Sequence, residues 1–312
     1  MPLLPPTKDV LDALHQTALP AAAGAALVTA AFLSLGRWAA ALGAALAVAV
    51  GFGWANYTFD VLSWSGTGRV IPWYAEDGAP AWHRLPRAAA FLLVAGLVSR
   101  WLGLLSDRLL TERYWWGANL FTWAVRVASV AVVAPGLVPD AAAADHVWLR
   151  PALVVVMLAL WVVLDGVART NTGTEVAAYL AATFVVAGAV LLYAHSARFM
   201  DVAVMCGCAA AGVAVAAFPT RADASGAVPL GVVGLPALML HGRVSLDSQV
   251  PVTSFALVAL APLALLPFLI PAVARRPRWV VIPLRALLVL APLVAAVVLA
   301  AQHEKLAFEE EW

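Results

Sequence analysis

The chain has 312 residues, of which 63% are hydrophobic and 12% charged, and its formal net charge is +1. Soluble domains carry about 25% charged residues, so this composition excludes an ordinary soluble globular protein. The two cysteines, Cys206 and Cys208, share one apolar run, which excludes a disulfide framework and a zinc-ribbon motif.

Apolar segments long enough to cross a bilayer follow one another along the chain. A hydrocarbon core of roughly 30 Å needs about 20 residues of helix, and lipid offers no partner to an unpaired backbone amide. The sequence therefore predicts an all-α integral membrane bundle of about ten transmembrane segments, forming one membrane domain over residues 1–312. The expected segments are 19–35, 38–55, 88–106, 117–138, 151–168, 176–194, 202–218, 228–241, 252–274 and 279–301.

Small residues recur every four positions in the second segment, at Ala39, Gly43, Ala47, Gly51 and Ala55. This spacing places them on one helix face, which indicates close packing against another helix.

Residues 56–87 form the longest polar interruption and contain Trp64, Trp73 and Trp82. Because tryptophan favours the headgroup layer, we expect a Trp-rich loop that lies along the membrane surface. A lid over a central cavity is the alternative interpretation of the same residues.

A polar stripe crosses the fourth segment. Asn119, Thr122, Arg126 and Ser129 recur at intervals of three and four, so they share one helix face. An unpaired arginine in a bilayer costs at least about 2.5 kcal/mol, so the stripe should face the bundle interior or a watery cavity. Two hypotheses stay open: an interhelical ion pair that fixes packing, or an anion-attracting or proton-linked site on a translocation path.

Acidic residues in the next two segments each have a local explanation. Asp165 precedes Arg169 by four residues, which is the favourable order for a pair on one helix. Glu175 begins the sixth segment, where a carboxylate complements the helix dipole. Asp165 nevertheless belongs to the candidate polar path with the stripe on the fourth segment.

The last three segments are rich in helix-disrupting residues. The eighth segment, 228–241, is short and contains Pro229, Gly231, Gly234 and Pro236, so we expect a broken or half-length helix. Interrupted helices form midplane binding sites in transporters, although packing is the other explanation. Prolines at 262, 267 and 271 predict a kink in the ninth segment, and residues 302–312 form a short acidic tail.

The charge distribution gives a topology. With ten spans, the membrane face shared with the N-terminus carries eight basic and thirteen acidic residues, a net charge of −5. The opposite face carries nine basic and five acidic residues, a net charge of +4. Because positive loops tend to stay in the cytoplasm, both termini are expected outside it. The excess of arginine over lysine favours a bacterial source, and hence a multi-pass protein of the bacterial cytoplasmic membrane.

Two histidines are the candidate metal or haem ligands. His195 and His241 end two spans at similar depth, and imidazole binds zinc, copper or haem iron. Neither has a second histidine at ligand spacing, so no cofactor is predicted.

The function hypothesis that the sequence favours is a transporter or permease for a small, anionic solute, because Arg126 lies within a membrane span. A non-catalytic subunit or scaffold is the alternative, with homo-oligomers or other membrane subunits as partners beside the lipid bilayer. A third hypothesis is an enzyme acting on a lipid-linked substrate through Asp60, Glu76, Asp77 and His83. No catalytic motif occurs, and no nucleic-acid partner is expected.

Overall fold

The computed structural model describes residues 18–35, 39–63, 85–109, 115–139, 146–170, 174–219, 223–244, 250–274 and 277–310. Helices fill these ranges almost completely, as the apolar segments predicted. Their bounds are α2 (Leu19–Ser34), α3 (Ala40–Ser63), α4 (Leu85–Leu109), α5 (Trp115–Leu137), α7 (Leu149–Thr170), α8 (Thr174–Tyr193), α9 (Ala197–Ala217), η5 (Ser225–Ala227), α10 (Val228–Val244), α11 (Val252–Leu260), η6 (Ala261–Leu269), α12 (Pro271–Ala274) and α13 (Arg278–Glu310).

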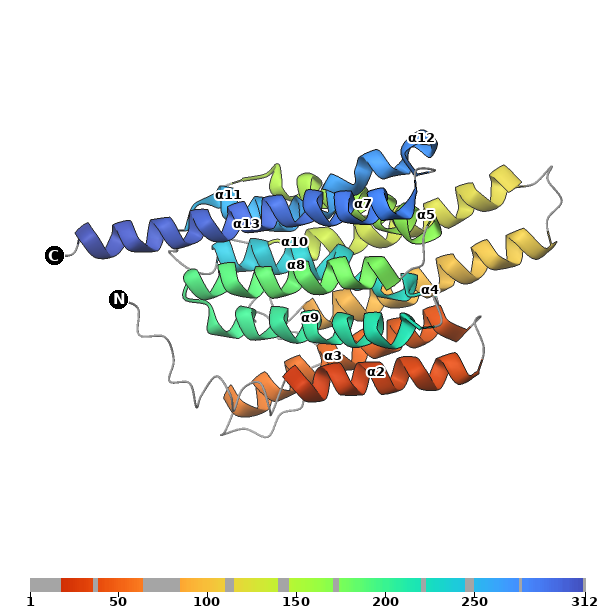
Figure 1. Ribbon diagram of the computed structural model, residues 1–312, viewed down its shortest axis with the longest axis horizontal. Coiled ribbons are helices and arrows are strands. Elements are labelled where there is room, and N and C mark those ends of the chain that lie inside the picture. Colours follow the sequence, from red (N-terminus) through yellow and green to blue (C-terminus); the bar gives the residue numbers. More distant parts are fainter. Residues whose placement is uncertain are drawn as a thin grey trace.

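The helices are long and apolar enough to make the chain a multi-pass membrane protein. Within the described ranges, seven helical stretches can cross a membrane by length and composition, and three shorter apolar helices lie in α2, α3 and α4. Consecutive long helices run in opposite directions along the long axis of the molecule (Figure 1). The expected all-α membrane bundle is therefore confirmed.

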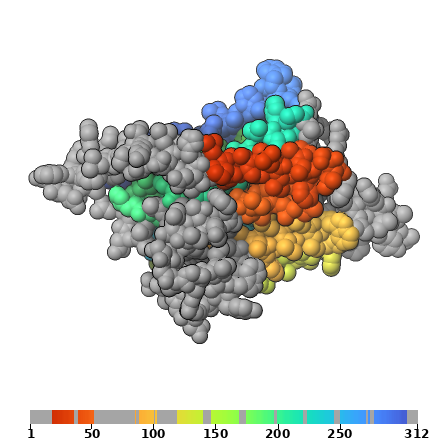
Figure 2. Space-filling model, turned by 90° about the horizontal axis from the view of Figure 1, so that it is seen from below, coloured from red at the N-terminus to blue at the C-terminus, as the bar shows by residue number. Residues whose placement is uncertain are grey.

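Helix α10 lies at the centre of the bundle. It packs against α4, α7, α8, α9 and α11, and every residue from Val228 to Met239 is buried. Helices α2, α3 and α4 lie side by side on the face shown in Figure 2, in red, orange and yellow. The segment with the most glycine and proline is therefore the one most completely surrounded by other helices.

The expected break in 228–241 is wrong, because α10 continues through all of these residues. Pro229 lies in the first turn, where its missing N–H removes no intrahelical hydrogen bond. The glycines bring α8 close: a Cβ atom at Gly234 would lie 2.9 Å from Phe184 Cζ, and one at Gly231 would collide with Leu180. Glycine serves helix packing here and does not interrupt the helix.

The ninth segment, for which the prolines predicted a kink, is not one regular α-helix. At Ala261 the α-helix α11 gives way to η6, which continues for nine residues as a 3₁₀-helix with Pro267 inside it. Runs of 3₁₀-helix longer than three or four residues are uncommon, and they often mark a hinge or local strain. Helix η6 packs against α7 and α13, which places this irregular segment beside two long spans.

Three helices extend beyond the expected limits. Helix α3 continues to Ser63 and α4 begins at Leu85, so both ends of the expected loop 56–87 are helical. Residues 64–84, with Trp64, Trp73 and Trp82, lie outside the described residues. Helix α13 continues to Glu310, so the expected acidic tail is a helical extension as far as that residue.

Small residues allow the helices to approach closely, as the spacing in the second segment indicated. Ala39, Gly43, Ala47 and Gly51 are buried, and a Cβ atom at Gly51 would collide with Ala209 of α9. A Cβ at Gly212 of α9 would collide with the carbonyl oxygen of Ala22 on α2. The α2, α3 and α9 group thus depends on the absence of side chains at its contacts.

We predict that Gly212→Ala destabilises the protein and that Gly24→Ala does not. The new methyl group at position 212 meets backbone atoms, which cannot move aside, so overpacking should cost about 1–3 kcal/mol. Nothing lies within 4 Å of a Cβ at Gly24, and alanine is the better helix former there. Melting temperatures of both variants in the same detergent test this, and equal losses would contradict the α2–α9 contact.

Candidate functional site

The polar stripe of α5 faces the bundle interior, as predicted. Thr122, Arg126 and Ser129 are buried and Asn119 is half-buried. The exposed fraction of Arg126 is only 2%, although its guanidinium carries a full charge. Its carbon atom Cζ lies 4.9 Å from the ring centroid of Trp123 and 5.5 Å from that of Trp161, within the range of cation–π attraction.

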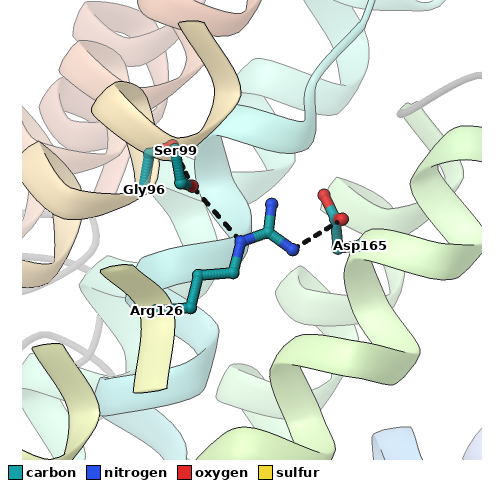
Figure 3. A network of polar contacts seen from close by, with 4 residues as sticks. All are labelled: Gly96, Ser99, Arg126 and Asp165. Atoms are coloured by element: carbon teal, nitrogen blue, oxygen red, sulfur yellow. Dashed lines mark hydrogen bonds and ion pairs between the residues drawn. The ribbon is translucent and has the colours of Figure 1, made fainter. Parts of the chain in front are cut away.

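Arg126 forms an ion pair with Asp165 across two helices. Its Nη1 donates a hydrogen bond of 2.9 Å to Asp165 Oδ2, and its Nε donates one of 3.2 Å to Ser99 Oγ (Figure 3). The Ser99 hydroxyl in turn donates to the carbonyl oxygen of Gly96 at 2.9 Å. One side chain on α5 therefore ties together α4, α5 and α7.

This ion pair resolves part of what the sequence left open. Asp165 was expected to pair with Arg169 on its own helix, and the structure adds a partner on α5. The side chain of Arg169 lies outside the described part of the chain. Arg126 thus has an interhelical ion pair, with Asp165 of α7 as its partner, and both roles considered for Arg126 stay predictions.

A small cavity with a partly polar lining adjoins the ion pair. Its volume is about 20 Å³, and Arg126, Asp165, Trp161 and Ser225 contribute to its lining. This volume is enough for roughly one water molecule. The Ser225 hydroxyl is buried and has no hydrogen-bond partner among the described residues, so the cavity offers a further polar group.

The cavity lies where the start of α10 meets α3 and α4. The Ser225 N–H donates to Asp223 Oδ1 at 2.9 Å, which fixes the turn that leads into η5 and α10. A Cβ atom at Gly226 would collide with the Ala41 carbonyl of α3, and one at Gly96 of α4 would collide with the ring of Pro229. Glycine at both positions therefore lets five segments converge on the site.

A second buried ion pair joins α13 to α8. Arg285 Nη1 lies 3.1 Å from Glu175 Oε2, and Arg285 Cζ lies 4.7 Å from the ring centroid of Phe268 on η6. Arg285 is completely buried, and its Nε and Nη2 have no hydrogen-bond partner in the residues that the structure describes. The sequence explained Glu175 by the helix dipole alone and missed this pair. The sequence does contain a signal for this pair, because Arg285 lies within a span. Charged side chains there pair with one another or with backbone carbonyls.

The two histidines that were candidate metal ligands lie in different surroundings. His195 is exposed, with a positive φ of 57°, and it ends α8 in a Schellman motif in which Ser196 N–H donates to Leu191 O at 2.9 Å. His241 is buried in the last turn of α10 and stacks on Phe199 at a centroid distance of 6.0 Å. Within the described ranges no group of three or more His, Cys, Asp or Glu residues could hold a metal ion. Nothing in this part of the chain tests the two histidines as metal ligands.

Comparison with known proteins adds no functional assignment. No protein-family model, curated protein or solved structure matches the chain. The function is therefore inferred from the chemistry of the Arg126 site, which combines a buried cation, a buried acid and a small cavity with a partly polar lining.

We predict that Arg126→Leu and Asp165→Leu each destabilise the protein strongly, whereas the double variant recovers much of the loss. Each single change leaves one buried charge without its partner, which costs about 3–5 kcal/mol, while an apolar pair costs far less. The melting temperatures of the single and double variants in one detergent measure this coupling.

Ser129→Ala is the matched control for the same helix face. Its hydroxyl donates to the Val125 carbonyl of its own helix at 2.6 Å, so its removal should change the melting temperature little. Losses that simply add in the Arg126 and Asp165 double variant would show that the two residues do not depend on each other.

Proposed function

We propose that the protein is a membrane transporter for a small anionic solute, with Arg126 as the solute contact and Asp165 as the proton carrier. The observation that supports it is a buried ion pair beside a small cavity with a partly polar lining, where α3, α4, α5, α7 and the start of α10 converge. Ionisable residues inside a membrane protein typically mark substrate paths or proton relays. The proposal keeps Thr122 and Asn119 as further polar groups on the α5 side of the path.

Electroneutrality suggests how the solute and a proton are coupled. Arg126 and Asp165 together carry no net charge, so an anion that joined them would bring an uncompensated negative charge into the bundle. If Asp165 takes up one proton, Arg126 can exchange its carboxylate partner for the anion and the site stays neutral. This scheme moves one proton with each monovalent anion in the same direction.

Access to Arg126 requires helices to move, because a cavity of about 20 Å³ has room for roughly one water molecule. The irregular segment η6 is well placed to allow this movement. Gly166, next to Asp165 on α7, packs closely against the side chain of Leu269 at the end of η6. A shift of η6 would therefore change the packing of the turn that carries Asp165.

The proposed orientation places both termini outside the cytoplasm of a bacterial cell. The Glu175 pair then lies near the cytoplasmic face, because Glu175 is in the first turn of α8 and Arg285 is near the start of α13. Reporter enzymes fused after residue 312 check this orientation. Activity of a cytoplasm-specific reporter at this position would reverse the assignment.

The alternative, a non-catalytic subunit, has less support in the described residues. Small residues of α2, α3 and α9 form contacts within the chain, as at Gly51 and Gly212, so these faces are already covered. Of the residues in the enzyme hypothesis, Glu76, Asp77 and His83 lie outside the described ranges, and Asp60 lies in α3 with its side chain not described.

We predict that the purified protein in liposomes couples anion entry to proton entry. Vesicles with a pH-sensitive dye inside receive inward gradients of chloride, nitrate or phosphate, and at least one of them should acidify the lumen. Arg126→Gln should abolish the acidification, because the solute loses its cationic contact. Asp165→Asn should retain anion flux, measured with a labelled anion, but move no protons.

Ser129→Ala is again the control, because its hydroxyl bonds within α5 and should not affect flux. Insertion and monodispersity of each variant are checked before the assay. Flux that survives Arg126→Gln unchanged would remove Arg126 from the path. Absence of flux for all three anions, together with stoichiometric partner proteins in a native mass spectrum, would favour the subunit hypothesis.

A further inference from the structure

An apolar groove opens between α7 and α11, and its floor is the central helix α10. Its volume is about 220 Å³, well above the roughly 150 Å³ of an apolar cavity that accepts benzene. Pro236, Met239 and Leu240 of α10 form the floor, and Val156 and Phe255 are among the residues of the two walls. The groove thus reaches α10, a helix that neighbouring helices cover along the rest of its length.

The groove extends from one membrane face towards the middle of the bundle. Its α7 wall runs from Leu149 to Val156, which is about 10 Å of helix at 1.5 Å per residue. Helix α7 begins, α10 ends and α11 begins at the same face, and η6 packs against α7 beyond the inner end. This length fits within one leaflet, which is about half of a 30 Å hydrocarbon core.

The lining of the groove changes character at its outer end. Apart from Arg243, every residue that lines it is apolar, so water inside would find few hydrogen-bond partners. Arg243 lies in the last turn of α10, at the end that meets the headgroup layer. A hydrocarbon groove that ends in a guanidinium is complementary to a molecule with an apolar chain and an anionic head.

We propose that this groove binds one acyl chain of an anionic phospholipid, with the headgroup phosphate on Arg243. The acyl chain of the lipid packs on Met239 and Leu240, which lie one turn before Arg243 on α10. A guanidinium can bind phosphate oxygens through two parallel hydrogen bonds, and its positive charge favours a head with a net negative charge over a zwitterionic one. The lipid then fills the space between α7 and α11 and supports the contact of both with α10.

Lipid retention in native mass spectra tests the site. The purified protein is mixed with equal amounts of phosphatidylglycerol and phosphatidylcholine in mild detergent, and one phosphatidylglycerol molecule should remain bound. Arg243→Gln should reduce the preference for phosphatidylglycerol about tenfold or more, because a charge-assisted hydrogen bond is lost. Ala256→Phe places a ring over the groove and should reduce the retention of both lipids.

Two matched variants separate this site from general lipid contact. Arg150→Gln removes an exposed cation at the start of α7, at the same membrane face, but its side chain does not line the groove. Ala128→Phe adds a ring to an exposed position on α5, away from the groove. Both should retain phosphatidylglycerol as the wild type does.

Several results would overturn the proposal. Equal retention of the two lipids by the wild type would show that the groove does not select a net negative headgroup. An unchanged preference in Arg243→Gln would show that Arg243 is not the contact of that headgroup. Undiminished retention in Ala256→Phe would place the lipid elsewhere. If Ala256→Phe is not monodisperse, the comparison of Arg243→Gln with Arg150→Gln still decides, and none of these results depends on transport.

Discussion

The structure depends on one constraint: lipid supplies neither hydrogen-bond partners nor counter-ions, so the chain must satisfy its polar groups internally. Helices do this for the backbone. Two hydroxyl groups within the spans are satisfied by their own helix, since Thr29 donates to Ala25 O at 2.8 Å and Thr183 to Tyr179 O at 2.7 Å. A charged side chain cannot be satisfied by its own helix backbone alone, and therefore the two buried arginines determine which helices must be neighbours.

The two ion pairs tie together different parts of the bundle. Arg126 links α5 to α4 and α7, whereas Arg285 links α13 to α8 and stacks on η6. Small residues complete the arrangement, because glycine at positions 96 and 226 lets α4 and the start of η5 reach their neighbours closely. Charge pairing selects the neighbours, and small side chains set how near they come. Helix α10 is central because both kinds of contact surround it.

Much of this arrangement can be predicted from the sequence, and the rest depends on which helices meet. The apolar runs give the helices, and the spacing from Asn119 to Ser129 gives the inward face of α5. The partner of Arg126 does not follow from spacing, since Arg169 is nearer to Asp165 in the sequence while Arg126 lies on another helix. The glycines of α10 resemble helix breakers in a sequence, and only their contacts with α8 show that they serve packing. Ser225 carries no sequence signal, because its burial results from the convergence of separate helices.

The surroundings of the two arginines differ in a way that bears on function. A buried ion pair holds helices together no better than an apolar pair of similar volume, so packing alone does not explain why charges are present. Arg285 has one carboxylate and one aromatic face, and two of its nitrogen atoms, Nε and Nη2, have no partner among the described residues. Arg126 has a carboxylate, a serine, two tryptophan faces and a cavity that Ser225 also lines. Neutralising one charge requires only Asp165. The additional polar groups around Arg126 suit a binding site for a small anion, and for this reason we propose transport at this arginine and a bridging role for Arg285.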